Sequence, residues 1–265
     1  MDMQERNLVS VIMPCHNGSR FIRDAIKSVI RQTYKKWELI VIDDNSTDNS
    51  TQIVQGFIGL DSRVKLLINK HSNGRPSAPR NLGLSHAVGQ YIAFLDCDDL
   101  WTESHLEKLL NCFREKDVVA AYSWYDRIKE DGTRIETVWA PSRLTYDTLL
   151  YDNFIGNLTG IYDSTKAGII FQKSCGHEDY LMWLEVLKDH GCAKCTDTIE
   201  AYYRIQNDSV SANKFKAMTW RWNILHNELR LNLFASGYYW LVSIFFIITK
   251  RKRVSRFLYQ HLIKL

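Results

Sequence analysis

The sequence predicts an α/β fold in which a mostly parallel sheet is flanked by helices. The chain has 265 residues, 45% of them hydrophobic. That content is ample for a buried core and excludes a disordered or low-complexity protein. Short, nearly continuous apolar runs alternate with segments whose apolar residues recur every three or four positions. Strands and helices alternating at these lengths are typical of a parallel sheet with right-handed crossovers.

The first half of the chain carries this alternation most clearly. The apolar runs that predict strands are Leu8–Met13, Glu38–Ile42, Val64–Ile68 and Gln90–Leu95. Helical spacing predicts helices over residues 21–30, 53–58, 76–89 and 106–113. Farther along, Asp131-Gly132 lies between polar, β-prone flanks and predicts a hairpin. The second half should therefore add antiparallel strands.

Polar residues follow three of the four predicted strands. They are Pro14 to Asn17, the pair Asp43-Asp44, and Asp96 to Asp99. Ligands of open parallel sheets bind beyond the carboxyl ends of the strands, so we expect one site at this rim. Asp96 and Asp98, one residue apart after a buried run, could hold Mg²⁺ or Mn²⁺. A solvated acidic turn is the alternative for this motif alone.

Several motifs together resemble a known family. They are Ser10–Pro14 with Asn17, Asp43–Asp48, Arg80-Asn81, Phe94–Asp99 and Glu178-Asp179. In order and spacing they resemble the family 2 inverting glycosyltransferases of the GT-A fold across roughly residues 8–211. The resemblance implies a Rossmann-like α/β/α sandwich that binds a nucleotide sugar, usually a UDP sugar.

The resemblance also implies roles for individual residues. Those expected at the nucleotide-sugar site are Pro14, Asn17, Asp43, Asp44, Arg80 and Asp96. Among them, Asp44 is expected at the uracil, Arg80 near the pyrophosphate, and Asp96 near the ribose or donor sugar. Asp98 is expected to bind the Mn²⁺ or Mg²⁺ cofactor. A divalent cation there would stabilise the negative charge that builds on the departing diphosphate.

The segment His177-Glu178-Asp179 is the candidate catalytic segment. In the resembled family an aspartate at the position of Asp179 is the general base that deprotonates the acceptor hydroxyl. A single in-line displacement then inverts the anomeric carbon. Glu178 and His177 are assigned supporting roles. An acidic pair that merely suits the first turn of a helix is the alternative interpretation.

Three further positions follow Tyr203 near the end of the resemblance. Many relatives carry a histidine where this chain has Gln206, and a glutamine cannot serve as an ionisable ligand. A metal role at Gln206 is therefore not expected. Arg204 and Ser211 remain as candidate phosphate contacts.

The chain is expected to divide into a catalytic domain, residues 1–212, and a helical tail, residues 213–265. Within the domain, residues 1–124 form the nucleotide-sugar half and residues 125–212 the acceptor half. From Lys214 onward ten residues are basic and one is acidic, which gives +9 against a net charge of +4 for the whole chain. Such a basic segment usually meets phosphate groups.

The tail contains the apolar, aromatic run Tyr238–Thr249, followed directly by Lys250–Arg253. Twelve helical residues span about 18 Å, short of the roughly 30 Å hydrocarbon core. We therefore favour an interfacial helix with its basic cluster on anionic headgroups over a buried terminal helix. An amphipathic helix is expected upstream, with its apolar stripe at Phe215, Met218, Trp222, Leu225, Leu229 and Leu233. Nucleic acid is not an expected partner, because no binding motif is present.

The cysteines and the first residues of the chain indicate in which cellular compartment the protein is expected. Met1–Asn7 is polar, so no secretory segment is expected. Six cysteines in a chain of this length are too few for a disulfide scaffold, which indicates free thiols and a cytosolic setting. Cys192 and Cys195 are interpreted as structural thiols, because no second pair completes a zinc site.

The predicted function is that of an inverting, metal-dependent glycosyltransferase. It moves a sugar from a UDP sugar to a polyprenyl-diphosphate-linked saccharide on the inner face of the cell membrane. The resemblance points to bacterial O-antigen, lipopolysaccharide or capsule synthesis. One alternative is a metal-dependent phosphatase or phosphotransferase with Asp96 as nucleophile; another is a non-catalytic nucleotide-sugar binding module. Dehydrogenase and P-loop functions are excluded, because neither glycine motif occurs.

Overall fold

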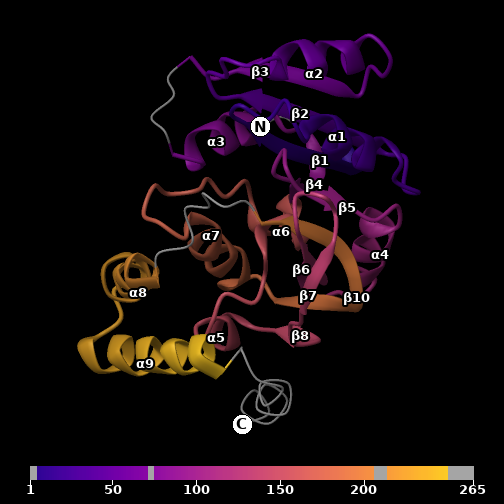
Figure 1. Cartoon of the computed structure of the whole chain (residues 1–265). Coiled ribbons are helices and arrows are strands. Elements are labelled where there is room, and N and C mark those ends of the chain that lie inside the picture. The colour runs from indigo at the N-terminus through magenta and orange to yellow at the C-terminus, as the bar shows by residue number, and fades with distance from the viewer. Residues whose placement is uncertain (1–4, 71–74, 206–213, 250–265) are drawn as a thin grey trace.

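The fold is seen in a computed structural model that describes residues 5–70, 75–205 and 214–249 (Figure 1). For residues 214, 215 and 245–249 only the backbone is described. The first half of the chain forms a parallel sheet in the order β3-β2-β1-β4. Its strands are β1 (Glu5–Cys15), β2 (Trp37–Asp43), β3 (Val64–Ile68) and β4 (Gly89–Phe94). The four predicted strands are thus confirmed.

Helices follow these strands as the spacing predicts. They are α1 (Ile22–Ile30), α2 (Ser50–Ile58), α3 (Ser77–His86) and α4 (His105–Cys112). The side chains of β1 point alternately to two cores. Val11 and Met13 pack with α1, α2 and α4 on one face of the sheet, whereas Ile12 packs with α3 and α7 on the other. The result is the three-layered α/β/α arrangement of the GT-A fold.

The second half continues the same sheet with mixed strand directions. Its strands are β5 (Leu100–Trp101), β6 (Val118–Ile128), β7 (Arg134–Val138), β8 (Arg143–Leu144), β9 (Ile161–Asp163) and β10 (Cys192–Arg204). β9 pairs antiparallel with both β4 and β6, and β10 runs parallel to β6. β6 and β7 form the predicted hairpin, with Gly132 at φ +86° in its turn. The sheet is therefore continuous from β3 to β10.

Short helices and one long one accompany these strands. They are α5 (Tyr146–Leu149), the 3₁₀ turn η1 (Asn157–Thr159), α6 (Ser164–Ala167) and α7 (Glu178–Leu187). α7 is buried along almost its whole length, and Trp183 packs edge-on against Phe94 and Tyr162. Because it is packed against the sheet in this way, the first turn of α7 is held in a fixed position.

The C-terminal helices differ from the sequence prediction in their boundaries. α8 (Lys214–Asn223) runs into the π-helical turn η3 (Ile224–Glu228), and α9 (Leu233–Thr249) begins after a break (Figure 1). The single helix expected up to Leu233 is therefore wrong. Arg230, at φ +55°, ends the helical path, while Leu229 and Leu231 both pack on the core. Apolar spacing alone could not reveal a turn whose residues pack like those of the helix.

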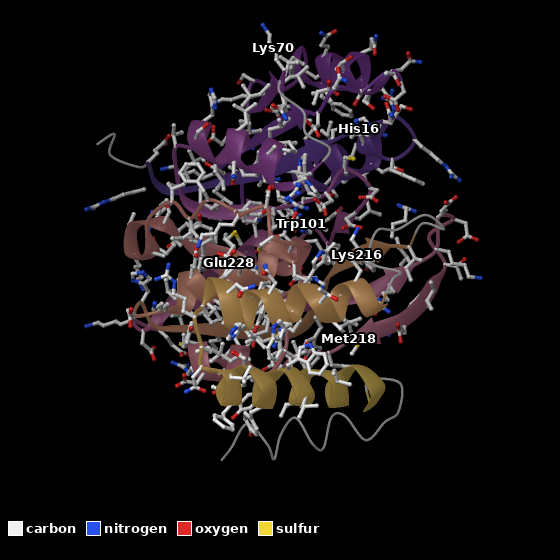
Figure 2. The ribbon with its side chains drawn as sticks, turned by 90° about the vertical axis from the view of Figure 1, so that its left-hand side faces the viewer. His16, Lys70, Trp101, Lys216, Met218 and Glu228 are labelled. Carbon is white, nitrogen blue, oxygen red and sulfur yellow. The ribbon has the colours of Figure 1, made fainter. Side chains whose placement is uncertain are left out.

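α9 lies at the end of the molecule opposite to β2 and β3 (Figure 1). The Trp240 indole on α9 donates a hydrogen bond of 3.0 Å to the carbonyl of Met218, which lies on the side of α8 that faces α9 (Figure 2). In the described part of the chain, no helix is long and apolar enough to cross a membrane. The basic cluster Lys250–Arg253 falls outside the described residues, as do Gln206 and Ser211.

Candidate active site

The rim of the sheet begins with Asp43 and Asp44 at the end of β2. Asp44 is buried, and its Oδ1 accepts a 2.5 Å hydrogen bond from the amide of Asn69, which follows β3. The Asp44 N–H donates to the carbonyl of Cys15 at the end of β1. Asp43 Oδ2 accepts from the N–H of Ser46 at 3.2 Å. The ends of β1, β2 and β3 are thereby tied into one rim; the sequence predicts this for β1 and β2 but did not include the end of β3.

Asn17 joins the loop after β1 to the loop after β2. Its backbone is left-handed, at φ +50°. Its Oδ1 accepts from the N–H of Thr47 at 2.8 Å, while its own N–H donates to Ser46 Oγ at 3.0 Å. Pro14 lies opposite Ile42 in the pairing of β1 with β2. The residues expected to line the nucleotide pocket on this side therefore lie together.

Arg80 is the central charged residue of the site. It comes from α3, is buried, and places Nη2 2.7 Å from Asp96 Oδ1. Burial lowers the pKa of its guanidinium, but the charge of Asp96 and then those of Asp179 and Glu178 raise the pKa above its usual value. Arg80 is thus close enough to interact with acids from two distant segments. It connects the end of β4 with the start of α7.

Asp98 and Asp99 form the outer part of the acidic turn. Asp99 is buried, and burial together with the charges of Asp98 and Asp96 raises its pKa well above its usual value. Its Oδ1 accepts a 2.8 Å hydrogen bond from the N–H of Arg204. Asp98 is partly exposed at the rim. Unlike Asp99, Asp98 is accessible to a ligand from solvent.

Arg204, the last residue of β10, supports this turn. Its Nε donates to the carbonyl of Asp98 at 2.9 Å, and its Nη1 donates to the carbonyl of Glu130 at 2.6 Å. The guanidinium also lies over the ring of Phe21, 4.5 Å from the centroid. Arg204 therefore joins the acidic turn to the β6–β7 hairpin. Its phosphate contact stays a prediction.

A hollow of about 480 Å³ adjoins Arg204. It is lined by Arg20, Lys129, Glu130, Asp131, Ile135 and Ile205. Arg20 and Glu130 form an ion pair across it, so the loop after β1 and the hairpin meet here. Four of its six lining residues belong to the hairpin that Arg204 holds.

The acidic turn fits a cation that is shared with substrate phosphates. No group of three or more His, Cys, Asp or Glu side chains able to hold a metal occurs within residues 5–70, 75–205 and 214–249. Mg²⁺ and Mn²⁺ commonly use one or two carboxylates and complete their shell with water and phosphate oxygens. Asp96 is already paired with Arg80. Asp98, partly exposed at the rim, stays the predicted ligand of such an ion.

The start of α7 carries the candidate catalytic segment. Gly176 (φ +76°) and His177 (φ +51°) are both left-handed, and this tight turn directs Glu178 and Asp179 into the first turn of the helix. The ring of His177 stands edge-on to Trp220 of α8, at 5.4 Å. A Cβ on Gly176 would lie 2.4 Å from the same indole. α8 therefore packs against the turn that precedes Glu178 and Asp179.

Three residues that the sequence analysis did not identify also belong to the site. Asn153 Nδ2 donates to Asp179 Oδ2 at 3.2 Å, and Gln172 Oε1 lies 3.5 Å from Arg80 Nη1. Asn69, already described, contacts Asp44. The sequence could have pointed to Asn69, because this residue directly follows a predicted strand. Asn153 and Gln172 lie in irregular segments, where no periodicity identifies a partner.

The chain resembles known proteins in sequence and in fold. The family model described as Glycosyl transferase family 2 matches residues 10–174. The chain is 38% identical over 244 residues to "UDP-Glc:alpha-D-GlcNAc-diphosphoundecaprenol beta-1,3-glucosyltransferase WfgD" of Escherichia coli, covering 92% of this chain and 94% of that protein. It is 36% identical over 227 residues to the "Putative teichuronic acid biosynthesis glycosyltransferase TuaG" of Bacillus subtilis (strain 168), covering 85% and 90%.

Solved structures share the fold at lower sequence identity. S. aureus TarS 1-349 in complex with UDP-GlcNAc has a TM-score of 0.70 at 20% identity, covering 89% of this chain and 71% of that one. The mannosyltransferase PcManGT from Pyrobaculum calidifontis, in complex with GDP-Man and Mn²⁺, has a TM-score of 0.66 at 16% identity, covering 87% and 69%. These structures show the shared fold, and the family match over residues 10–174 together with the relative at 38% identity shows that the chain belongs to glycosyl transferase family 2.

Proposed function

We propose that this glycosyltransferase is inverting and metal-dependent, and that it moves a sugar from a UDP sugar to a hydroxyl of a polyprenyl-diphosphate-linked saccharide. The observation that carries the proposal is the position of Arg80. It is buried and paired with Asp96 on the nucleotide side, and the charges of Asp179 and Glu178 on α7 also raise its pKa. A donor diphosphate near Arg80 would lie within reach of both groups. The site then has a cationic side for the leaving group and a carboxylate for the acceptor.

The donor would bind along the rim of β1, β2 and β4. Asp44, held by Asn69, offers a fixed carboxylate to the uracil, and Asn17 keeps the two nearest loops together. Arg80 would donate charge-assisted hydrogen bonds to the diphosphate. Asp98 would hold Mn²⁺ or Mg²⁺, which supplies positive charge to the departing diphosphate. No protonated acid is then needed for departure.

Asp179 would take the proton from the acceptor hydroxyl. That oxygen attacks the anomeric carbon as the bond from this carbon to the diphosphate oxygen breaks, and the electron pair leaves with the nucleoside diphosphate. A single displacement of this kind inverts the configuration. Glu178 and His177 would support the base. A positioned general base contributes typically about 10²- to 10⁴-fold to the rate.

The acceptor class rests on the relatives. WfgD and WfaP of Escherichia coli, the latter 34% identical over 218 residues, both bear names that specify UDP-Glc as donor and α-D-GlcNAc-diphosphoundecaprenol as acceptor. WfgD aligns over 94% of its own length. We therefore place this chain in the synthesis of a bacterial cell-surface polysaccharide such as O-antigen or capsule.

Two substitutions test the mechanism. Asp179→Asn removes the base, so transfer from radiolabelled UDP-glucose to a GlcNAc-diphosphate lipid should fall about 10²- to 10⁴-fold while UDP binding is kept. Asp98→Asn should instead weaken UDP binding in Mn²⁺ and leave the weak binding in EDTA unchanged. Full transfer by Asp179→Asn would contradict the assigned base. Hydrolysis of simple phosphate esters without sugar transfer would favour the phosphatase alternative.

We also propose that α9 lies on the cytoplasmic face of the membrane, where a lipid-linked acceptor is found. Four large side chains on this helix are exposed although they are apolar or aromatic: Leu233 (62%), Phe234 (90%), Tyr238 (56%) and Leu241 (62%). Ser236 and Ser243 are buried toward the rest of the molecule. In the sequence, the basic run Lys250–Arg253 follows α9 directly. Apolar residues beside a basic cluster are typical of interfacial helices.

Vesicle binding tests this location. Wild-type protein should co-sediment with phosphatidylglycerol vesicles more than with phosphatidylcholine vesicles, and less as salt is raised. Phe234→Asp together with Leu241→Asp should reduce that binding. Leu60→Asp is the matched control, because Leu60 is also exposed (83%) but follows α2, far from α9. Equal binding by all variants would contradict a membrane role for this face.

A further inference from the structure

Asn153 contacts the carboxylate proposed as the base. It lies in the irregular segment between α5 and η1, and its Nδ2 is 3.2 Å from Asp179 Oδ2. A carboxylate offers only acceptors, so the amide must direct its NH₂ group to Asp179. Within the described part of the chain, this is the hydrogen bond that the Asp179 side chain makes. The contact therefore fixes the orientation of both side chains.

The carbonyl oxygen of the Asn153 side chain has no hydrogen-bond partner among the described residues. Asn153 Oδ1 is buried and accepts no hydrogen bond from the described residues. A buried carbonyl without a donor costs stability, whereas an apolar side chain of similar shape would not. Asparagine is thus a poor choice for packing at this position. It is a good choice for donating to Asp179.

The charges around Asp179 indicate why a neutral donor suits the position. Arg80, from α3, is acted on by the charges of Asp179 and Glu178, and Arg221 of α8 and Asp152 act on Tyr180, the residue after Asp179. A second cation would stabilise the carboxylate strongly and weaken it as a base. A neutral amide orients Oδ2 with a smaller effect on basicity. Oδ1 of Asp179 then remains for the proton of the acceptor.

We infer that Asn153 is a positioning residue for Asp179, holding the carboxylate in the orientation that receives the acceptor proton. This inference rests on the proposed role of Asp179. It assigns Asn153 no contact with the donor. A defect at Asn153 should therefore appear in kcat for transfer and in the pH dependence of kcat, and not in the KM for the UDP sugar.

Asn153→Leu and Asn153→Asp test the inference. The leucine variant should lose roughly 10- to 100-fold in kcat, because the base is no longer oriented. Its KM for UDP-glucose should be unchanged and its melting temperature equal or higher. The aspartate variant places a second carboxylate beside Asp179, which favours protonation of the pair. The acid limb of its kcat–pH profile should move to higher pH by about one unit or more.

Asn157→Leu is the matched control. Asn157 lies four residues farther along, in η1, and its amide atoms are also buried without a partner among the described residues. It has no hydrogen bond to Asp179, so kcat and the pH profile should stay as in the wild type. Wild-type kcat in Asn153→Leu, or equal losses of kcat and melting temperature in both leucine variants, would overturn the inference. Normal transfer by Asp179→Asn would instead overturn the proposed base itself.

Discussion

Arg80 and Asp96 form an ion pair of 2.7 Å that joins helix α3 to the end of strand β4. The Arg80 side chain is 9% exposed and that of Asp96 is 32% exposed. The guanidinium is thus fixed by burial, whereas the carboxylate still reaches the rim. An arrangement of this kind keeps positive charge beside the proposed nucleotide site before any substrate is bound.

Arg80→Met should weaken donor binding and lower stability together. The variant leaves Asp96 and Gln172 without their partner, so the free energy of unfolding should fall by about 1–3 kcal/mol. The KM for the UDP sugar should rise about tenfold or more, because one charge-assisted hydrogen bond is lost. Urea unfolding and steady-state kinetics measure the two effects.

The Arg127–Glu136 pair provides the control for Arg80. It has a similar length, 2.8 Å, but its side chains are 41% and 53% exposed. Arg127→Met should cost no more than about 1 kcal/mol and leave the KM unchanged. Equal losses from both variants would show that burial of Arg80 has no special consequence.

The sequence predicts the nucleotide half of the fold well, for a physical reason. β1, β2 and β4 are covered on both faces, so their residues form near-continuous apolar runs that end in polar loops. β10 was not predicted. Its thirteen residues include Lys194, Asp197 and Glu200, so no continuous apolar run marks the strand, although Glu200 is buried and paired with Lys108. Asp44, Asp98 and Asp179 were identified through a family resemblance, whereas Asn153 depends on packing that spacing does not encode.

Two substitutions of Asn17 should separate the effect of its left-handed backbone on stability from the effect of its side chain on donor binding. Its φ of +50° is tolerated by glycine, but for alanine it costs about 1–2 kcal/mol. Both Asn17→Gly and Asn17→Ala lose the bond to Thr47, so both should raise the KM for the donor. Only the alanine variant should carry the additional loss in unfolding free energy. Identical urea curves for the two variants would contradict this division.

Gly176→Ala should displace α8 from the catalytic segment. A methyl group there would lie 2.4 Å from the Trp220 ring, at a backbone φ of +76°. The combined strain and overlap should cost about 2–4 kcal/mol and change the fluorescence of Trp220. The control is Gly132→Ala, whose φ is +86° but whose Cβ meets nothing within 4 Å. If both variants lose the same stability, contact with Trp220 is not what requires glycine.

His105 should make stability depend on pH between about 6.5 and 3. Its ring is buried, stacks on Trp101 at 4.2 Å, and donates from Nδ1 to the carbonyl of Glu200. Burial lowers its pKa to about 3, although the nearby Glu200 acts in the opposite direction. The folded state therefore binds the proton less readily than the unfolded state. Its stabilising contribution is complete above pH 6.5 and is lost as the pH falls toward 3.

His105→Phe removes this titration and keeps an aromatic ring against Trp101. Between pH 7 and pH 5 the wild type should lose about 2 kcal/mol more unfolding free energy than the variant, because an unfolded histidine titrates near 6.5. Urea unfolding at several pH values measures the difference. Other buried acids such as Asp99 are present in both proteins, so their pH-dependent contributions to the unfolding free energy cancel in the comparison. Parallel curves for the two proteins would mean that His105 is protonated equally in the folded and unfolded states.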